Sequence, residues 1–212
     1  MITDIDEKML RINVDMEDYA YYRNLKNRVL YLCSLISNSD SENGGYCLSI
    51  TSQLVSDIIE YNRQDKDKPV EEREPIKLFI NSPGGSVIEG FALVGAIESS
   101  RTPIYTINIG EWSSMAFLIG ITGHKRFSLP YSQFLMHDGA TVAYDSSNKA
   151  QDKMEFEKRF EQEVVRRHVL KHSKMKGEVY DALARVEFYL LPEDAKKYGF
   201  IDEIIANIDD IL

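Results

Sequence analysis

Apolar residues fall into short continuous runs and into longer segments with helical periodicity, and the two kinds of segment alternate along the middle of the chain. Continuous runs at residues 76–80 and 104–109 predict buried strands. Apolar residues recur at helical spacing over 48–59, and apolar or small residues dominate 87–97 and 113–121, so these three segments are expected to be helices. The strand–helix–strand–helix order predicts right-handed parallel crossovers in an α/β domain.

The same pattern extends to both sides of this central unit. Residues 19–26 are expected to form a helix and 29–33 a short apolar strand, and two further short strands are expected at 125–129 and 133–136. The longest helix is predicted over 149–172, where charged residues form the majority. A helix of that length with a narrow apolar stripe needs a partner surface to cover the stripe.

Two segments lack such a pattern. Residues 1–16 are charged without a clean period and are expected to form a mobile arm, which leaves 17–212 as a single domain. Residues 65–74 are also highly charged and are expected to be a loop in solvent.

Composition narrows the class of protein. The chain has 212 residues, of which 43% are hydrophobic and 28% charged, as is usual for a globular domain with a sizeable core. Its net charge of −9 argues against nucleic acid or anionic lipid as a partner. Neither a secretory signal nor a membrane span is expected. Cys33 and Cys47 both stand in apolar contexts and are expected to be buried free thiols, which favours a cytoplasmic location.

Three separated motifs carry candidate chemistry. Asn81-Ser82-Pro83-Gly84-Gly85-Ser86 follows a strand, and its paired glycines leave backbone N–H groups free to face an anion. Ser114 opens a predicted helix at a sharp turn after a strand, which is typical of an exposed nucleophile. His137 ends a strand-like run and suits the role of its base. Taken singly, Ser114 could instead be a helix cap and Gly84-Gly85 an ordinary turn.

With these motifs in place, the chain resembles the ClpP-type serine peptidases over roughly residues 21–205. The resemblance rests on five blocks in the family's order and approximate spacing: residues 23–29, 79–86, 114–115, 134–137 and 193–202. It implies a ClpP/crotonase-like fold, with stacked parallel β-strands, crossover helices and a long projecting handle helix. It also selects Ser114 over Ser113, because Met115 completes the family's Ser-Met pair.

The resemblance implies a catalytic triad and an oxyanion hole. Ser114 and His137 take the first two triad positions, and counting back from Tyr198-Gly199 places Glu187 where the family has an aspartate. The longer side chain moves the carboxylate by more than about 1 Å unless the backbone compensates. The open alternatives are Asp181 and Asp194 in place of Glu187, with Asp138 too close to His137 along the chain to be preferred, and a solvated Glu187 with no catalytic part.

The oxyanion hole is assigned to the backbone N–H groups of Gly85 and Met115. Glu111 and Trp112 depart from the family pattern of small or apolar residues before the nucleophile. They are expected either to reshape the substrate pocket or raise the pKa of the base, or to be a packing variation only.

The remaining histidines do not predict a metal centre. His124 lies in a Gly-His-Lys-Arg turn and is expected to be solvated. His168 and His172 stand four apart on the long helix, a spacing that suits a metal only if a third ligand, such as a carboxylate, lies beside them. No metal and no organic cofactor is therefore expected.

The function implied by the resemblance is a serine endopeptidase that cuts unfolded polypeptides inside a homo-oligomeric chamber of stacked rings. The alternatives are a catalytically weak or inactive ring subunit and, from the same superfamily, a crotonase-type acyl-CoA enzyme. Family members pair with ring-shaped ATPase unfoldases, which insert an apolar loop into an aromatic-lined surface pocket. Here Phe79 keeps one aromatic wall, whereas Lys77 and Ser99 stand where two others are expected, so weak coupling is predicted.

Overall fold

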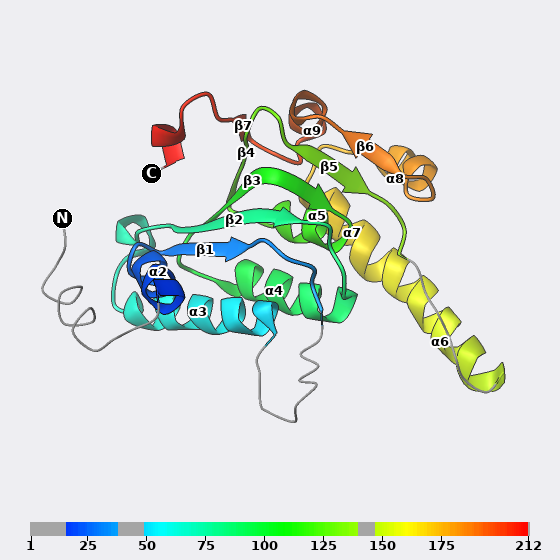
Figure 1. Ribbon diagram of the computed structural model, residues 1–212. Coiled ribbons are helices and arrows are strands. Elements are labelled where there is room, and N and C mark those ends of the chain that lie inside the picture. The colour runs from blue at the N-terminus through cyan, green and yellow to red at the C-terminus, as the bar shows by residue number, and fades with distance from the viewer. Residues whose placement is uncertain (1–15, 38–48, 140–146, 212) are drawn as a thin grey trace, which may run out of the picture.

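The computed structural model describes residues 16–37, 49–139 and 147–211 (Figure 1). The predicted mobile arm therefore lies outside the described residues, except for Met16, which begins helix α2 (Met16–Lys26). In the described part of the chain, no helix is long and apolar enough to cross a membrane.

A parallel sheet forms the centre of the molecule. Its strands lie in the order β1 (Val29–Leu32), β2 (Ile76–Ser82), β3 (Ile104–Ser113), β4 (Lys125–Ser128) and β7 (Glu203–Ile204). Each neighbouring pair is parallel, as the strand–helix alternation predicts. The mixed α/β architecture expected from the sequence is confirmed.

Strand β3 is longer than expected and serves two sets of neighbours. Its residues 105–108 pair with β4, and its residues 111–113 pair with β5 (Gln133–Met136). Strand β6 (Phe188–Leu190) then adds to β5 in the antiparallel direction. The second half of β3 thus carries a small three-stranded unit at the edge of the main sheet.

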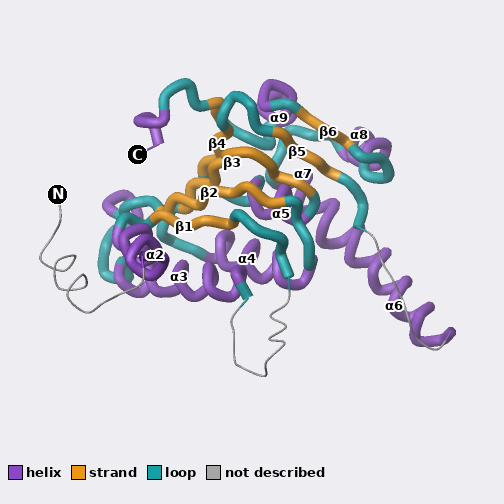
Figure 2. The backbone as a smooth tube through the Cα atoms, in the orientation of Figure 1, coloured by secondary structure: helices purple, strands orange, loops and turns teal. Residues whose placement is uncertain are grey.

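The crossover helices pack mainly on one side of the sheet. Helices α3 (Ile50–Gln64) and α4 (Val87–Ser99) lie against each other below the strands, with α5 (Met115–Gly120) further along the same side (Figures 1 and 2). Ser49 and Ser86 cap α3 and α4 by accepting a hydrogen bond from the backbone N–H three residues on, which fixes where these helices begin.

The long helix predicted over 149–172 is a run of three consecutive helical segments. These are α6 (Ser147–Phe160), a π-helical turn (Glu161–Val165) and α7 (Arg166–Lys171). In Figure 1, α6 extends away from the body while α7 packs beside α5. Helices α8 (Gly177–Leu183) and α9 (Pro192–Tyr198) follow; α8 contacts α7, and α9 packs on the β5–β6 unit. Short 3₁₀ turns at Val70–Glu72 and Ile208–Ile211 complete the described elements.

The main core lies between the sheet and these helices. The strands are buried along most of their length, as expected for a parallel sheet covered by helices. The largest side chains with almost no exposed surface include Trp112, Phe117, Phe134, Phe200 and Ile76. Aromatic edges meet aromatic faces between Trp112 and Phe134 and between Phe117 and Phe200, with ring centroids 5.5 and 4.8 Å apart.

Two expectations about single residues are wrong. Residues 65–74 do not lie wholly in solvent, because Asp65 is completely buried and forms a bidentate ion pair with the Arg28 guanidinium, at 2.5 and 2.9 Å. Cys33 is a free thiol but an exposed one, since it follows β1 at the point where the chain leaves the sheet. Cys47 lies outside the described residues.

Candidate active site

The turn after β2 is fixed by Ser82, which is completely buried. Its hydroxyl donates a hydrogen bond to the carbonyl oxygen of Ser34 at 2.6 Å and accepts one from the Gly84 N–H at 3.1 Å. The start of the glycine pair is therefore held from both sides before the chain enters α4.

Gly84 and Gly85 adopt backbone angles that other residues rarely reach, with φ of +93° and +138°. The Ile36 backbone brackets them, since its N–H donates to the Gly84 oxygen at 2.8 Å and its oxygen accepts from the Ser86 N–H at 2.7 Å. In a trans peptide the C=O and the following N–H point in opposite directions. The Gly84 oxygen points to Ile36, so the Gly85 N–H points away from Ile36.

Ser114 occupies the sharp turn between β3 and α5 and also has a left-handed backbone, with φ of 54°. Such a conformation in a residue with a Cβ costs on the order of 1–3 kcal/mol and is kept only where the surroundings enforce it. Ser114 makes no side-chain hydrogen bond to the helix, so it does not act as a conventional cap. Its N–H donates instead to the Leu135 oxygen of β5 at 2.9 Å.

The glycine turn lies directly against the serine turn. A Cβ placed on Gly84 would come within 2.8 Å of both Ser114 Cβ and the Met115 nitrogen, and within 2.6 Å of the Ser113 oxygen. Within the described part of the chain, the hydrogen bonds of these turns employ neither the Gly85 N–H nor the Met115 N–H. Two unengaged donors therefore lie close to the Ser114 side chain.

His137 and Glu187 are related by the β5–β6 pairing. The antiparallel register pairs Phe134 with Leu190 and Met136 with Phe188. Continued by one position, it sets His137 opposite Glu187, and directly opposed residues have Cβ atoms about 4.5–5.5 Å apart. His137 is half-buried and Glu187 is exposed. The same strand β5 holds the Ser114 N–H through Leu135, so all three predicted residues gather at one end of the β3–β5–β6 unit.

No hydrogen bond joins Ser114 to His137, or His137 to Glu187, among the residues that the structure describes. The Glu187 carboxylate instead accepts a hydrogen bond from the Tyr189 hydroxyl at 3.0 Å, and this bond raises the pKa of Tyr189. Catalytic hydrogen bonds are often loose before substrate binds. Tyr189 was not singled out from the sequence, although residues that stand two positions apart along a strand lie on the same face.

The alternative carboxylates lie in other surroundings. Asp181 forms a bidentate ion pair with Arg166, at 2.8 and 3.1 Å, whose hydrogen bond lowers the pKa of Asp181. Asp194 is exposed in the first turn of α9, where it faces the positive end of the helix dipole. Asp138 is exposed directly after His137.

The two departures before the nucleophile differ in kind. Trp112 is completely buried, its ring packs against Gly120 and Phe134, and its indole nitrogen is without a hydrogen-bond partner among the described residues. It is therefore a packing variation and not part of a substrate pocket. Glu111 accepts a hydrogen bond from the Ser113 hydroxyl at 2.5 Å, which keeps that neighbouring serine occupied.

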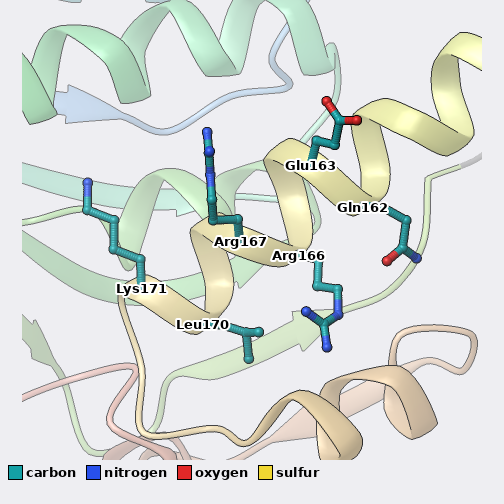
Figure 3. A pocket seen from close by; sticks show the side chains of 6 residues that line it. All are labelled: Gln162, Glu163, Arg166, Arg167, Leu170 and Lys171. Atoms are coloured by element: carbon teal, nitrogen blue, oxygen red, sulfur yellow. The ribbon is translucent and has the colours of Figure 1, made fainter.

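A hollow of about 670 Å³ lies on α7 and is lined by residues of that helix and of the π-helical turn, but by none of the five predicted site residues (Figure 3). Its lining residues are Gln162, Glu163, Arg166, Arg167, Leu170 and Lys171.

Comparison with known proteins places the same region in one family. The profile described as Clp protease matches residues 49–208. The chain is 35% identical to the ATP-dependent Clp protease proteolytic subunit 2 of Prochlorococcus marinus subsp. pastoris, over 74% of the chain and 77% of that protein. It is 32% identical to the ATP-dependent Clp protease proteolytic subunit 3 of Parasynechococcus marenigrum, over 85% of the chain and 83% of that protein.

Proposed function

The chain belongs to the Clp protease family, and from this premise we propose that it is a serine endopeptidase that hydrolyses unfolded polypeptides through an acyl-enzyme. Ser114 Oγ attacks the scissile carbonyl while His137 takes its proton and returns it to the leaving amine. Glu187 orients the imidazole and stabilises its charged form. The N–H groups of Gly85 and Met115 bind the oxyanion, and water completes hydrolysis. No cofactor enters these steps.

The observation that carries the proposal is the backbone of Ser114. A serine that only caps a helix needs neither a left-handed φ nor a glycine pressed against its Cβ, and Ser114 has both. The resulting turn exposes the hydroxyl beside two unengaged N–H groups, which is the arrangement that acyl transfer requires.

Labelling with a fluorophosphonate tests the assignment directly, because the reagent modifies an activated serine. We expect one label per chain on Ser114 and none in Ser114→Ala, whose peptide hydrolysis should fall by about 10⁶ in kcat. Ser113→Ala is the matched control, since the Ser113 hydroxyl is already donated to Glu111. Labelling that persists in Ser114→Ala, or is lost only in Ser113→Ala, would overturn the assignment.

The active form is proposed to be a chamber of stacked homo-oligomeric rings in the cytoplasm, in which residues 17–212 form one peptidase domain. Helix α6 supports this part of the proposal, because it projects from the body with Met154 and Phe156 more than half exposed. Stacking of two rings through these helices would cover both side chains.

An ATPase unfoldase is the proposed partner, with weak coupling. The β1–β4 sheet presents Phe79, which is nearly buried and stacks on Tyr31 with ring centroids 5.3 Å apart. Lys77 of β2 is paired with Tyr105 of β3. Ser99 is the last residue of α4, and its hydroxyl donates a hydrogen bond to the Gly95 oxygen. Lys77 and Ser99 therefore replace apolar surface in the wall of the unfoldase pocket. Burial of apolar surface contributes about 25 cal/mol per Å² to binding.

A second candidate is a ring subunit with little or no turnover. One observation favours it: the Glu187 carboxylate is engaged by Tyr189 and has no hydrogen bond to His137. Fluorophosphonate labelling separates the two candidates, because only the peptidase activates Ser114. The acyl-CoA alternative gains no support from the family match.

A further inference from the structure

Three side chains outside the candidate active site converge between α4 and α7. Glu98 comes from the last turn of α4, His168 from α7, and His172 from the residue that ends α7. One ligand atom from each lies within 4.8 Å of the others. The carboxylate that the i,i+4 histidine pair lacks in the sequence is thus supplied by another helix.

The hydrogen bonds of His168 define which of its ring nitrogens carries the proton. Its Nε2 lies 3.0 Å from the Leu118 oxygen and 3.2 Å from Thr122 Oγ1. The Thr122 hydroxyl proton is already donated to the Leu118 oxygen at 2.8 Å, so both neighbours act as acceptors toward Nε2. Nε2 therefore carries the proton, and Nδ1 presents a lone pair.

That lone pair faces a negative charge. His168 Nδ1 lies 3.8 Å from Glu98 Oε1, and the His168 side chain is only 6% exposed. A buried lone pair and a carboxylate that face each other leave a place for a cation.

We propose that Glu98, His168 and His172 form a divalent-metal site of the zinc type that joins α7 to α4. Two imidazoles and one carboxylate are ligands that Zn²⁺ prefers, with water in the fourth position. Tetrahedral bonds of about 2.0 Å separate neighbouring ligand atoms by about 3.3 Å. The distances from Glu98 Oε1 to His172 Nε2 and to His168 Nδ1, 2.8 and 3.8 Å, lie on either side of that value.

The hydrogen bond from His168 Nε2 to Leu118 is the outer contact that metal-bound histidines usually make, because it fixes the ring and its tautomer. When the metal binds, the His172 proton resides on Nδ1 so that Nε2 can coordinate. Lys171, whose ammonium lies 2.7 Å from Glu98 Oε1, leaves the carboxylate. Its side chain is 59% exposed and can turn into solvent.

The metal competes with the Lys171 ammonium for the Glu98 carboxylate, and this competition can be tested. Chelator-stripped protein is titrated with Zn²⁺ by calorimetry, and the stoichiometry is checked by elemental analysis after dialysis. We expect one Zn²⁺ per chain in the unaltered protein and in His124→Gln, which alters an exposed histidine elsewhere. The bound Zn²⁺ should be lost in Glu98→Gln and in His172→Gln.

Lys171→Met should bind Zn²⁺ about tenfold more tightly, because Glu98 then has no hydrogen bond from the Lys171 ammonium to lose when the metal binds. His172 is at the helix end and only partly buried, so His172→Gln retains the fold even if Glu98→Gln does not. Visible absorption of four-coordinate Co²⁺ in the unaltered protein provides a measurement that needs no variant. Failure to bind stoichiometric Zn²⁺, or binding that survives in His172→Gln, would overturn the proposal whatever the peptidase assay shows.

Discussion

At the scale of single residues, Gly84 has little freedom to change. Its φ of +93° strains any residue with a Cβ, and that Cβ would meet backbone atoms of Ser113 and Met115 that cannot yield cheaply. We expect Gly84→Ala to shift the serine turn and lower kcat at least about 100-fold, since a displacement of 1 Å can cost that much.

Gly95→Ala is the control for this change, because a Cβ there meets nothing within 4 Å and α4 continues past it. The measurement is hydrolysis of a fluorogenic peptide, with circular dichroism to show that both variants fold. Equal kcat values for the two variants would show that Gly84 does not support the serine turn.

Glu187 stands where the family has an aspartate, and its role can be separated from that of Asp194. Glu187→Gln should lower kcat by up to about 10⁴, because a neutral amide does not stabilise the imidazolium. Asp194→Asn, which alters an exposed residue in α9, should change kcat little. The comparison is made from pH–rate profiles of peptide hydrolysis, and the reverse ranking would transfer the role to Asp194.

At the scale of elements, the pair between Arg28 and Asp65 connects the start of β1 to the end of α3. Asp65 also accepts hydrogen bonds from Lys68 and Thr102 at 2.9 and 3.2 Å, so the buried carboxylate is fully engaged. Asp65→Asn removes the charge but leaves Arg28 buried, which typically costs about 3–5 kcal/mol of unfolding free energy. Urea denaturation at fixed protein concentration measures this loss.

Glu60→Gln is the control, since its pair with Arg63 is exposed on one helix and should contribute little. The pair also predicts a pH dependence. The hydrogen bond from Arg28 holds the pKa of Asp65 well below its usual range, so its stabilisation is complete above the unfolded pKa of about 3.9. It is lost as the pH falls below that value, and Asp65→Asn should lack this loss. An identical acid profile in the variant would contradict the assignment.

Hydrophobic periodicity predicted most of the elements, because the helices bury one face and the parallel strands are buried as continuous apolar runs. It placed β2, α4, β4 and β5 to within two residues of their observed bounds. It ended β3 too early, because Gly110 and Glu111 interrupt the apolar run, although Glu111 still pairs with Gln133 of β5. Asp65 was assigned to solvent because its partner Arg28 is 37 residues away, a separation that local pattern does not register.

The site shows the same limit. Gly84, Gly85 and Ser114 were recognisable because unusual backbone needs particular residues at particular positions. Ile36, which brackets the glycine pair through its backbone alone, leaves no signal in its side chain. Glu98 was not paired with His168 and His172, because helix packing brings together residues that lie 70 and 74 positions apart in the sequence.

At the scale of the whole molecule, we expect light scattering to show an assembly many times the chain mass of 24.3 kDa. The physical reason is the exposed apolar surface of α6, which a single chain leaves uncovered. Phe156→Glu should reduce the assembly to a smaller species, whereas Asp152→Ala on the same helix should not. A fully active monomer at micromolar concentration would rule out a closed chamber.

Coupling to an unfoldase is the second property of the assembly. We expect slow ATP-dependent degradation of a tagged folded protein with a standard unfoldase, because Lys77 and Ser99 reduce the apolar area available to an inserted loop. Ser99→Phe should increase the rate, and Ser56→Phe, at an exposed position of α3, serves as the control for a surface aromatic elsewhere. Robust degradation by the unaltered protein at sub-micromolar unfoldase would show that neighbouring residues already supply the pocket.

The division of β3 between two sets of neighbours has a consequence for local unfolding. β5 pairs with β3 at residues 111–113 only, whereas β2 pairs with it along most of its length. Opening of β5 and β6 as one cooperative unit therefore disturbs few contacts of the main sheet, so it requires less free energy than global unfolding. Such an opening would withdraw His137 and Glu187 together and would release the Ser114 N–H from Leu135, whereas Ile36 and Ser82 would still hold the glycine turn. The glycine turn and the His137–Glu187 pair thus lie on units of different local stability, and Ser114 lies between them.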